Sequence, residues 1–184
     1  MKVEATKLKD CYIIHDTVFE DSRGYFFESF NQQTFAKLTG LDVHFVQDNQ
    51  SKSSKGVLRG LHFQKGEHAQ AKLVRVLQGR VLDVAVDIRP DSPTFGQHVA
   101  VELTAENHLQ LFVPRGFAHG FIVLEDHTVF FYKCDNFYNK ASEGGLMFND
   151  ADLNIDWILK GEELILSEKD KNNPLLKDLK KDYL

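Results

Sequence analysis

The chain of 184 residues is 42% hydrophobic, 27% charged and 11% aromatic, a composition typical of globular proteins, and its formal net charge is -5. This length can bury one sizeable core and is short for two domains, so we expect a single domain over residues 1–184. Binding nucleic acid requires a basic stripe that neutralises phosphates. The sequence has no basic run, which argues against nucleic acid as a partner.

The N-terminal residues, MKVEATKLKDCYIIHD, contain no apolar run long enough for a signal peptide. No stretch of the chain approaches the roughly 20 apolar residues of a membrane span. We therefore expect a cytoplasmic protein with no membrane partner. Cys11 and Cys134 lack the spacing of a metal site, and in a reducing compartment we expect them to be free thiols.

The first elements in chain order are two candidate strands and a short helix. Tyr12–Glu20 and Gly24–Phe30 are compatible with strands. Asn31–Thr39 predicts a short helix that ends at Gly40, a residue suited to the left-handed cap.

From Val57 to Cys134, short apolar or alternating runs are separated by turn residues such as QGR, RPDSPTFG and PRG. We expect strands at Val74–Leu77, Val81–Ile88, His98–Leu103, Leu109–Val113, Phe121–Leu124 and Thr128–Lys133. Strands at this spacing, without long helices between them, indicate an antiparallel sandwich or barrel, and a double-sheet jelly roll is the leading candidate. The final NPLLKDLKKDYL is compatible with a terminal helix that starts near Asn173.

The segment VLRGLHFQ contains a histidine within a predicted strand. Strict alternation places Leu58, Gly60 and His62 on one face, and Arg59 and Leu61 on the other. Taken alone, this segment favours a core histidine that is satisfied by one backbone partner.

In AKLVRV, Lys72 has the same parity as Val74 and Val76, so its side chain projects from an inward apolar face. Burying an unpaired ammonium costs several kcal/mol. We therefore expect Lys72 at a strand end or beside a polar cavity that holds anions. A lysine that reaches water at the sheet edge is an equally good interpretation of this segment alone.

The strand HTVFFYKC is apolar on both faces, which indicates a central position in a sheet. Tyr132 shares a face with Phe130 and Cys134, and its hydroxyl needs a hydrogen-bond partner there. A structural tyrosine is the commoner explanation of one such residue.

Metal-binding jelly rolls of the cupin type use a clustered His-x-His and a later histidine. Here Gln64 stands where the second histidine would be, and GEHAQAK lacks the usual spacing. PRGFAHGF, with His119, does resemble the second cupin motif. One histidine from each half is too few for a tight three-ligand site, so we expect no metal, with a metal-dependent enzyme kept as an alternative.

Long and unusual motifs follow one another along the chain: DSRGYFFESF, VQDNQSKSSKGVLRGLHFQ, VLQGRVLDVAVDIRPDSPTFG, LFVPRGFAHGF, YKCDNFYN, FNDADLNIDW and LSEKD. From roughly Tyr12 to Leu176, the sequence resembles the dTDP-4-dehydrorhamnose 3,5-epimerase family. The resemblance implies an all-β, cupin-like double-sheet jelly roll with short peripheral helices. It also implies a homodimer with exchanged N-terminal strands and the absence of any metal or organic cofactor.

The activity implied by the resemblance is inversion of C3 and C5 of dTDP-4-dehydro-6-deoxy-D-glucose, which gives dTDP-4-dehydro-L-rhamnose in dTDP-L-rhamnose biosynthesis. His62 resembles the family's general base, and Asp170 its carboxylate partner. Tyr132 looks like the general acid. Lys72 looks like the group that stabilises the enolate oxygen at C4, because the hydrogens at C3 and C5 are both α to the C4 ketone.

The resemblance also assigns residues that bind the dTDP-4-keto-6-deoxy-hexose substrate. They are Arg23, Glu28, Gln47, Asn49, Arg59, Lys72, His119, Glu143 and Lys169, with Tyr138 stacked on the thymine. In the family the early strands cross to the partner, so Arg23 and Glu28 are expected to serve the neighbour's site. Without the family, both would be read as surface charges beside a turn.

Two further alternatives stay open besides the metal-dependent enzyme. A mono-epimerase of a related dTDP-4-keto-6-deoxy sugar would share the scaffold. The residues beside Tyr132, which are Lys133, Cys134 and Asp135, do not indicate whether one carbon or two carbons are inverted. A non-catalytic sugar-nucleotide-binding cupin is the second alternative. It gives no reason for a base and an acid on opposite sides of a sugar ring.

Overall fold

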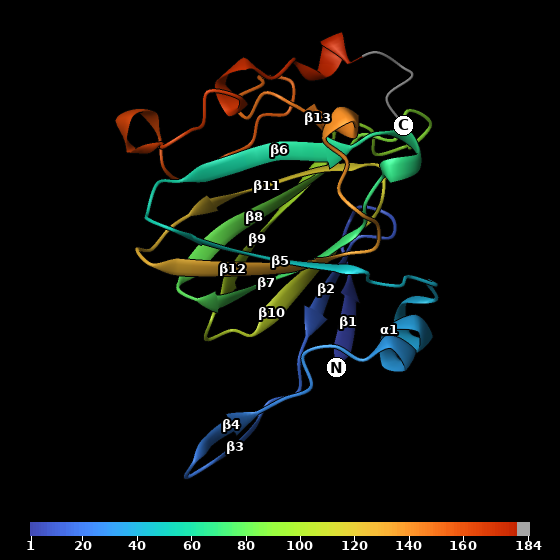
Figure 1. Ribbon diagram of the computed structural model, residues 1–184, viewed down its shortest axis with the longest axis vertical. Coiled ribbons are helices and arrows are strands. Elements are labelled where there is room, and N and C mark those ends of the chain that lie inside the picture. The colour runs from blue at the N-terminus through green and yellow to red at the C-terminus, as the bar shows by residue number, and fades with distance from the viewer. Residues whose placement is uncertain (180–184) are drawn as a thin grey trace.

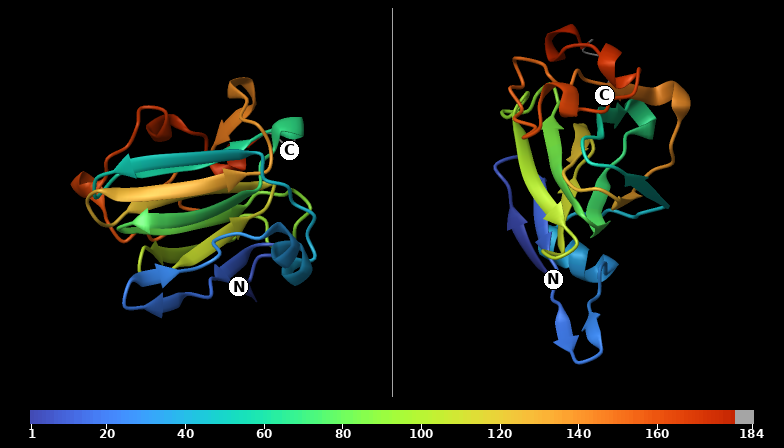
Figure 2. Two further views of the ribbon diagram at one scale, coloured as in Figure 1. Left: turned by 60° about the horizontal axis from the view of Figure 1, so that its bottom comes forward. Right: turned by 90° about the vertical axis from the view of Figure 1, so that its left-hand side faces the viewer.

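A computed structural model describes residues 1–179. Two antiparallel sheets lie face to face in it (Figures 1 and 2). The six-stranded sheet contains, in order, β1 (Lys2–Ala5), β2 (Tyr12–His15), β10 (Leu109–Val113), β7 (Lys72–Gln78), β12 (Thr128–Cys134) and β5 (Gln47–Ser53). The five-stranded sheet contains β13 (Glu143–Gly145), β6 (Leu58–Gln64), β11 (Phe117–Val123), β8 (Arg80–Asp87) and β9 (His98–Thr104). The predicted all-β double-sheet jelly roll is confirmed.

Apolar side chains fill the space between the sheets and cover both outer faces. Between the sheets, inward residues of β7, β8, β11 and β12 form one buried cluster that includes Val76, Val81 and Phe121. The C-terminal segment covers the outer face of the five-stranded sheet, where Trp157 is buried. Fully burying a large apolar side chain contributes about 1.5–3 kcal/mol relative to leaving it exposed, so these clusters hold the sheets at a fixed separation.

The helix α1 (Gln32–Thr39) is the predicted one, and its ends follow the expected chemistry. The side chain of Asn31 accepts a hydrogen bond from the Thr34 N–H at 3.0 Å, and Gly40 takes the left-handed conformation with φ of 73°. Phe35 is fully buried and packs against Phe112 on the outer face of the six-stranded sheet. The helix is thus held by its caps and by the aromatic contacts of Phe35, which also packs against Phe30 and Phe45. No helix within residues 1–179 is long and apolar enough to cross a membrane.

Several element boundaries differ from the prediction. Tyr12–Glu20 is two strands, because the chain leaves the sheet after His15 and enters a separate hairpin of β3 (Phe19–Asp21) and β4 (Gly24–Phe26). β11 begins at Phe117 rather than Phe121, so His119 lies inside a strand.

The C-terminal segment forms short 3-10 turns rather than the expected helix. One turn covers Leu176–Asp178, and Leu176 and Leu179 pack against the cluster on the outer face of the five-stranded sheet. Further turns are η1 (Gly66–His68), η2 (Lys140–Ser142), η3 (Gly161–Glu163) and η4 (Asp170–Asn172). The last five residues of the predicted terminal helix lie outside the described residues.

The strand β5 was not predicted, because its sequence, QDNQSKS, is polar throughout. Alternate residues are half-buried, and Gln47 and Asn49 line a polar cavity between the sheets. The strand lies at the edge of its sheet and pairs along its whole length with β12. Its inward face therefore carries amide and hydroxyl groups instead of the apolar residues by which a strand is recognised.

The strand β6 contains an extra residue relative to its partner β11. Arg59 lies opposite Phe121 and His62 lies opposite His119, so the register shifts between the two pairs. This bulge brings Arg59 and His62 to the same face, while Leu61 packs in the outer apolar cluster. The prediction that His62 and Arg59 lie on opposite faces was therefore wrong.

The bulge depends on two glycines that bring the backbones of β6 and β11 close together. Gly60 has φ of 137°, a conformation that L side chains rarely adopt. A Cβ added to Gly60 would lie 2.5 Å from the Cα of Gly120, which has no side chain to move away. The inward orientation of His62 thus requires glycine at position 60.

We predict that Gly60→Ala lowers the free energy of unfolding by about 3 kcal/mol, through the combined cost of positive φ and of overpacking. Gly66→Ala is the control, since Gly66 also has positive φ but no atom within 4 Å of an added Cβ. Its cost should be about 1 kcal/mol. Urea unfolding of both variants tests this, and equal losses would show that the close approach to Gly120 does not matter.

Candidate active site

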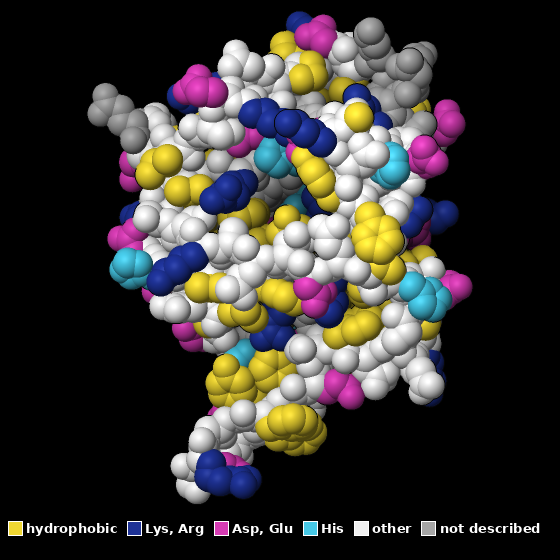
Figure 3. Space-filling view, viewed as in Figure 1, with side chains coloured by type: hydrophobic (Ala, Val, Ile, Leu, Met, Phe, Trp, Pro, Cys, Tyr) yellow, Lys and Arg dark blue, Asp and Glu magenta, His cyan; other side chains and the backbone are white. Residues whose placement is uncertain are grey.

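A cavity with two connected lobes opens between the sheets (Figure 3). The lobes have volumes of about 490 and 630 Å³. Both are lined by Asn49, His62, Lys72, Tyr132 and Lys169, so they form one continuous site. In Figure 3 the face is hollowed here, with histidine in the depth and lysine or arginine around the opening.

Most of the residues assigned from the sequence lie around this cavity. The ones that line it are Gln47, Asn49, Arg59, His62, Lys72, His119, Tyr132, Tyr138, Glu143, Lys169 and Asp170. They come from both sheets, from the loop after β12 and from the C-terminal segment. Residues far apart in the sequence therefore converge on one concave site.

His62 is paired with a buried carboxylate. Its Nε2 lies 2.5 Å from Oδ1 of Asp170, whose other oxygen accepts the hydroxyl of Ser167 at 2.8 Å. Burial by itself raises the pKa of Asp170, but the hydrogen bonds from His62 and Ser167 outweigh it and hold that pKa below its usual range. With Nε2–H donated to Asp170, Nδ1 of His62 keeps its lone pair. This arrangement suits a general base.

Tyr132 approaches the cavity from the opposite sheet. It lies on β12, next to Phe130, and its hydroxyl has no hydrogen-bond partner among residues 1–179. The expected protein partner for that hydroxyl is therefore not found in this part of the chain. Burial raises the pKa of Tyr132, so the phenol stays protonated at neutral pH and can give up a proton.

Two cationic side chains in the cavity lack a carboxylate partner. Lys72, at the start of β7, makes no salt bridge within residues 1–179, and burial lowers its pKa. Arg59 contacts only the hydroxyl of Ser53, at 3.3 Å, in the same part of the chain. Uncompensated cations in a cavity attract anions, so the site suits a ligand that carries or develops negative charge.

A second histidine and carboxylate pair lies below the cavity. Nε2 of His119 is 2.9 and 3.0 Å from the two oxygens of Asp83, and both side chains are buried. Burial lowers the pKa of His119, an effect that the Asp83 carboxylate opposes. His119 is thereby fixed where it lines the cavity.

Hydrogen bonds tie the loop after β12 to the cavity mouth. The hydroxyl of Tyr138 donates to Glu143 at 3.0 Å, and Nζ of Lys169 donates to the same carboxylate at 2.6 Å. The lysine is the main reason that the pKa of Glu143 is lowered. Gln64, which stands where a metal-binding cupin would have its second histidine, accepts the N–H of Asn139 at 3.0 Å.

Within residues 1–179, no three His, Cys, Asp or Glu side chains are grouped as a metal site would require. Nε2 of His62 and Nε2 of His119 both face carboxylates, Asp170 and Asp83. These two histidines stand at the positions of metal ligands in cupin motifs, and here their Nε2 atoms make hydrogen bonds within the protein.

Arg23 and Glu28 do not reach the cavity of their own chain. Arg23 lies at the tip of the β3–β4 hairpin, which projects away from the sheets (Figures 1 and 2), and it pairs with Asp21. Glu28 accepts a hydrogen bond from Asn31 at 3.1 Å.

The family model described as dTDP-4-dehydrorhamnose 3,5-epimerase matches residues 5–178. The chain belongs to the dTDP-4-dehydrorhamnose 3,5-epimerase family. The epimerase of that name from Salmonella typhimurium is 55% identical over 176 residues, which cover 96% of each chain. Every element of the cavity described above lies within the matched residues.

Solved structures of the dTDP-4-dehydrorhamnose 3,5-epimerase family share the fold over nearly the whole chain. The enzyme from Elizabethkingia anophelis has a TM-score of 0.95 and 65% identity, with 100% of this chain and 99% of that chain covered. The Legionella pneumophila enzyme, solved with dTDP-4-keto-L-rhamnose, has a TM-score of 0.93 and 47% identity, with 97% and 94% covered. A 3'-monoepimerase from Streptomyces bikiniensis also matches, at 32% identity and a TM-score of 0.88, with 94% and 86% covered. The scaffold of the epimerase family thus carries more than one regiochemistry.

Three residues of this epimerase site were missed in the sequence. Asp83 shares the parity of Val81 and Ala85 in VLDVAVD, so alternation could have predicted a charged side chain on the inward face of this strand. Ser167 stands three residues before Asp170, the spacing at which a hydroxyl can contact a following carboxylate. Phe137, exposed at the cavity mouth, has no distinguishing signal in the sequence.

The lowered pKa of Asp170 predicts a pH-dependent contribution to stability. A carboxylate with a depressed pKa stabilises the fold at neutral pH, and this contribution is lost as the pH falls through that pKa. We predict that Asp170→Asn destabilises by about 1–3 kcal/mol at about pH 7. The gap to wild type should narrow at about pH 3 in urea unfolding. A gap that is the same at both pH values would contradict the charge pairing.

Proposed function

We propose that this epimerase inverts C3 and C5 of dTDP-4-dehydro-6-deoxy-D-glucose and so produces dTDP-4-dehydro-L-rhamnose for dTDP-L-rhamnose biosynthesis. The observation that carries the proposal is the placement of His62 and Tyr132. They come from opposite sheets and line the same two lobes of one cavity. Inverting a carbon requires proton removal from one face and proton delivery to the other, and a cavity with a base and an acid on opposite walls supplies both.

In this mechanism Nδ1 of His62 removes the proton from C3 or C5, and Asp170 stabilises the imidazolium that forms. The electron pair moves to the C4 oxygen, where Lys72 stabilises the enolate. Tyr132 then delivers a proton to the opposite face, and its raised pKa keeps that proton available. Both carbons are α to the same ketone, so one set of residues serves both steps.

The substrate-binding residues surround the cavity in a way that fits a nucleotide sugar. Arg59 provides a planar donor for diphosphate oxygens, beside the half-exposed Lys169. Tyr138 is half-exposed at the mouth, where its ring stacks on the thymine. Gln47, Asn49, His119 and Glu143 supply the remaining polar contacts.

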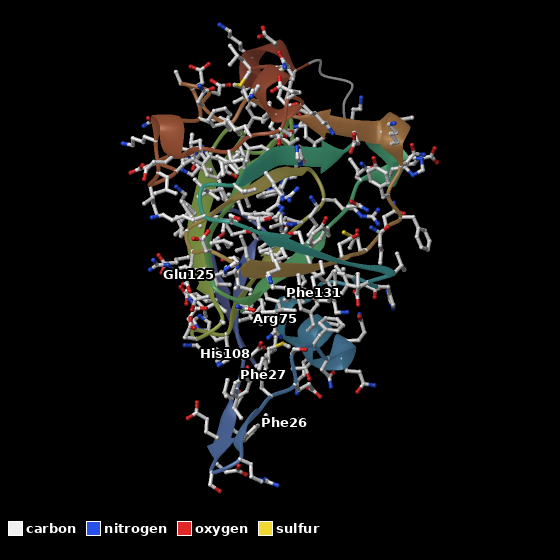
Figure 4. All side chains as sticks on the ribbon, turned by 60° about the vertical axis from the view of Figure 1, so that its left-hand side comes forward. Phe26, Phe27, Arg75, His108, Glu125 and Phe131 are labelled. Carbon is white, nitrogen blue, oxygen red and sulfur yellow. The ribbon has the colours of Figure 1, made fainter. Side chains whose placement is uncertain are left out.

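We further propose that the protein is a homodimer that exchanges its N-terminal hairpin. The hairpin exposes Phe26 to 71% and the side chain of Arg23 to 88%. At its base, Arg75 lies over the ring of Phe27 at 4.8 Å, and Phe131 lies on the same outward face of the six-stranded sheet (Figure 4). Exposed aromatic residues on a projecting hairpin suit burial against a second subunit. The partner's cavity would then receive Arg23 and Glu28.

The proposed activity predicts deuterium exchange without a metal. Wild-type protein treated with EDTA and incubated with dTDP-4-keto-6-deoxy-glucose in D₂O should place deuterium at both C3 and C5, seen by proton NMR. His62→Ala should lower both exchange rates by about 10²–10⁴-fold. Label at one carbon would indicate the mono-epimerase instead. No exchange by wild type would favour a binding protein, and activity lost with the metal and restored by zinc or iron would show a metal enzyme.

The exchanged dimer predicts complementation between inactive variants. In a mixed dimer of Arg23→Ala and His62→Ala, one site has its own His62 and receives an intact Arg23 from the partner. Refolded mixtures should therefore regain about a quarter of wild-type activity, because half the dimers are mixed and each has one complete site. A mixture of His62→Ala with Asp170→Ala is the control, since neither site becomes complete. Absence of recovery in mixed dimers, or a monomer in solution, would contradict the exchange.

A further inference from the structure

Asp83 lies where the apolar core between the sheets meets the cavity. On β8 it shares the inward face with Val81 and Ala85, which belong to the buried cluster. Its side chain is completely buried, and it lines neither lobe of the cavity. Asp83 therefore lies below the residues that face the ligand and cannot itself touch a substrate.

The carboxylate of Asp83 acts on two residues that do line the cavity. Both of its oxygens lie within 3.0 Å of Nε2 of His119. Burial lowers the pKa of Lys72, and two groups oppose this effect, a Cys134 thiolate more strongly and the charge of Asp83 less strongly. A carboxylate removed from water requires compensation, and so does an ammonium that has no salt bridge within residues 1–179. No salt bridge joins Asp83 to Lys72 in this part of the chain, so Asp83 acts on the ammonium through its buried charge and not through a direct contact.

Other charged or titratable groups line the cavity with Lys72, but they do not supply this negative charge. They are Arg59 and His62 of β6, His119 of β11, Tyr132 and Cys134 of β12, Tyr138 of the loop after β12, Glu143 of β13, and Lys169 and Asp170 of the C-terminal segment. The carboxylate of Glu143 is engaged by Lys169 and Tyr138. Burial raises the pKa of Cys134 to about 11 and raises that of Tyr132, so both are neutral near pH 7. Asp170 is engaged by His62 and Ser167.

We propose that Asp83 is a positioning residue of the epimerase, which keeps Lys72 charged and holds His119 in place without contacting the substrate. This inference rests on the proposed function for the role of Lys72 in catalysis. The electrostatic pairing itself does not, because it is a property of the folded chain alone. Asp83 thus sets the charge state of the group that faces the enolate oxygen.

The first test is the pH profile of kcat for Asp83→Asn. Asparagine keeps the shape and can still accept a hydrogen bond from His119, but it removes the charge beside Lys72. The alkaline limb of the profile should move to lower pH, while the acid limb should stay in place. A move by one pH unit lowers kcat up to about tenfold on the alkaline side.

Asp87→Asn is the matched control for the pH profile. Asp87 is also completely buried on β8, with the same parity as Asp83, but it holds Arg89, Ser92 and Thr94 away from the cavity. Its loss should lower stability and leave the alkaline limb unchanged. An alkaline limb that stays in place in Asp83→Asn, or that moves equally in both variants, would overturn the proposal.

The second test is a double-mutant cycle in urea unfolding without substrate. Asp83→Asn should lower the unfolding midpoint less in a Lys72→Met background than in wild type, because the unpaired ammonium is then gone. If Asp83→Asn alone does not fold but the double variant does, that rescue would support the proposal even more strongly. Additive losses, or a double variant that also fails to fold, would overturn the pairing. If the wild-type protein shows no deuterium exchange, the proposed function is refuted. The double-mutant cycle still tests the interaction of Asp83 with Lys72, because it measures stability without substrate.

Discussion

The close approach of the β6 and β11 backbones at Gly60 and Gly120 is the constraint on which the cavity depends. Only two residues without side chains allow it, and the resulting bulge turns Arg59 and His62 to the same inward face. Without the extra residue, one of the two would point into the outer apolar cluster. The proposed base, His62, and the arginine proposed to bind the diphosphate, Arg59, thus share a cavity because of one backbone irregularity.

The charges around the cavity are arranged by depth. Asp83 and His119 lie lowest and are buried together, and His62 and Asp170 lie above them with the side chain of His62 36% exposed. Lys72 and Arg59 keep no carboxylate of their own within residues 1–179. Pairing the deep charges limits the cost of burial, while the unpaired cations leave the site with affinity for anions. That distribution suits the diphosphate of the substrate and the enolate of the proposed mechanism.

The sequence predicted the inward face of Lys72, because β7 keeps strict alternation from Lys72 to Val76. The same reasoning failed for His62, since alternation carries no information about a bulge. β5 was missed because its inward residues face a polar cavity rather than the core. These failures share a cause: strand patterns report an apolar core, and the site is where that core is interrupted.

Other expectations depend on more than one folded chain. Arg23 and Glu28 were assigned by resemblance, and neither lines the cavity of its own chain. Arg23 lies on the projecting hairpin, and Glu28 lies between that hairpin and α1. The single domain and the cytoplasmic location stay predictions. The fold also does not determine which carbons are inverted, since a 3'-monoepimerase shares the scaffold.

In the proposed mechanism, His62 and Tyr132 act as base and acid from opposite sheets on opposite faces of the sugar. The most direct measurement is proton NMR in D₂O of the substrate incubated with Tyr132→Phe. Proton removal by His62 should persist, so that deuterium enters the substrate, while formation of the product inverted at C5 should fall much further than exchange does. Equal loss of exchange and inversion would contradict the claim that Tyr132 delivers the proton from the opposite wall.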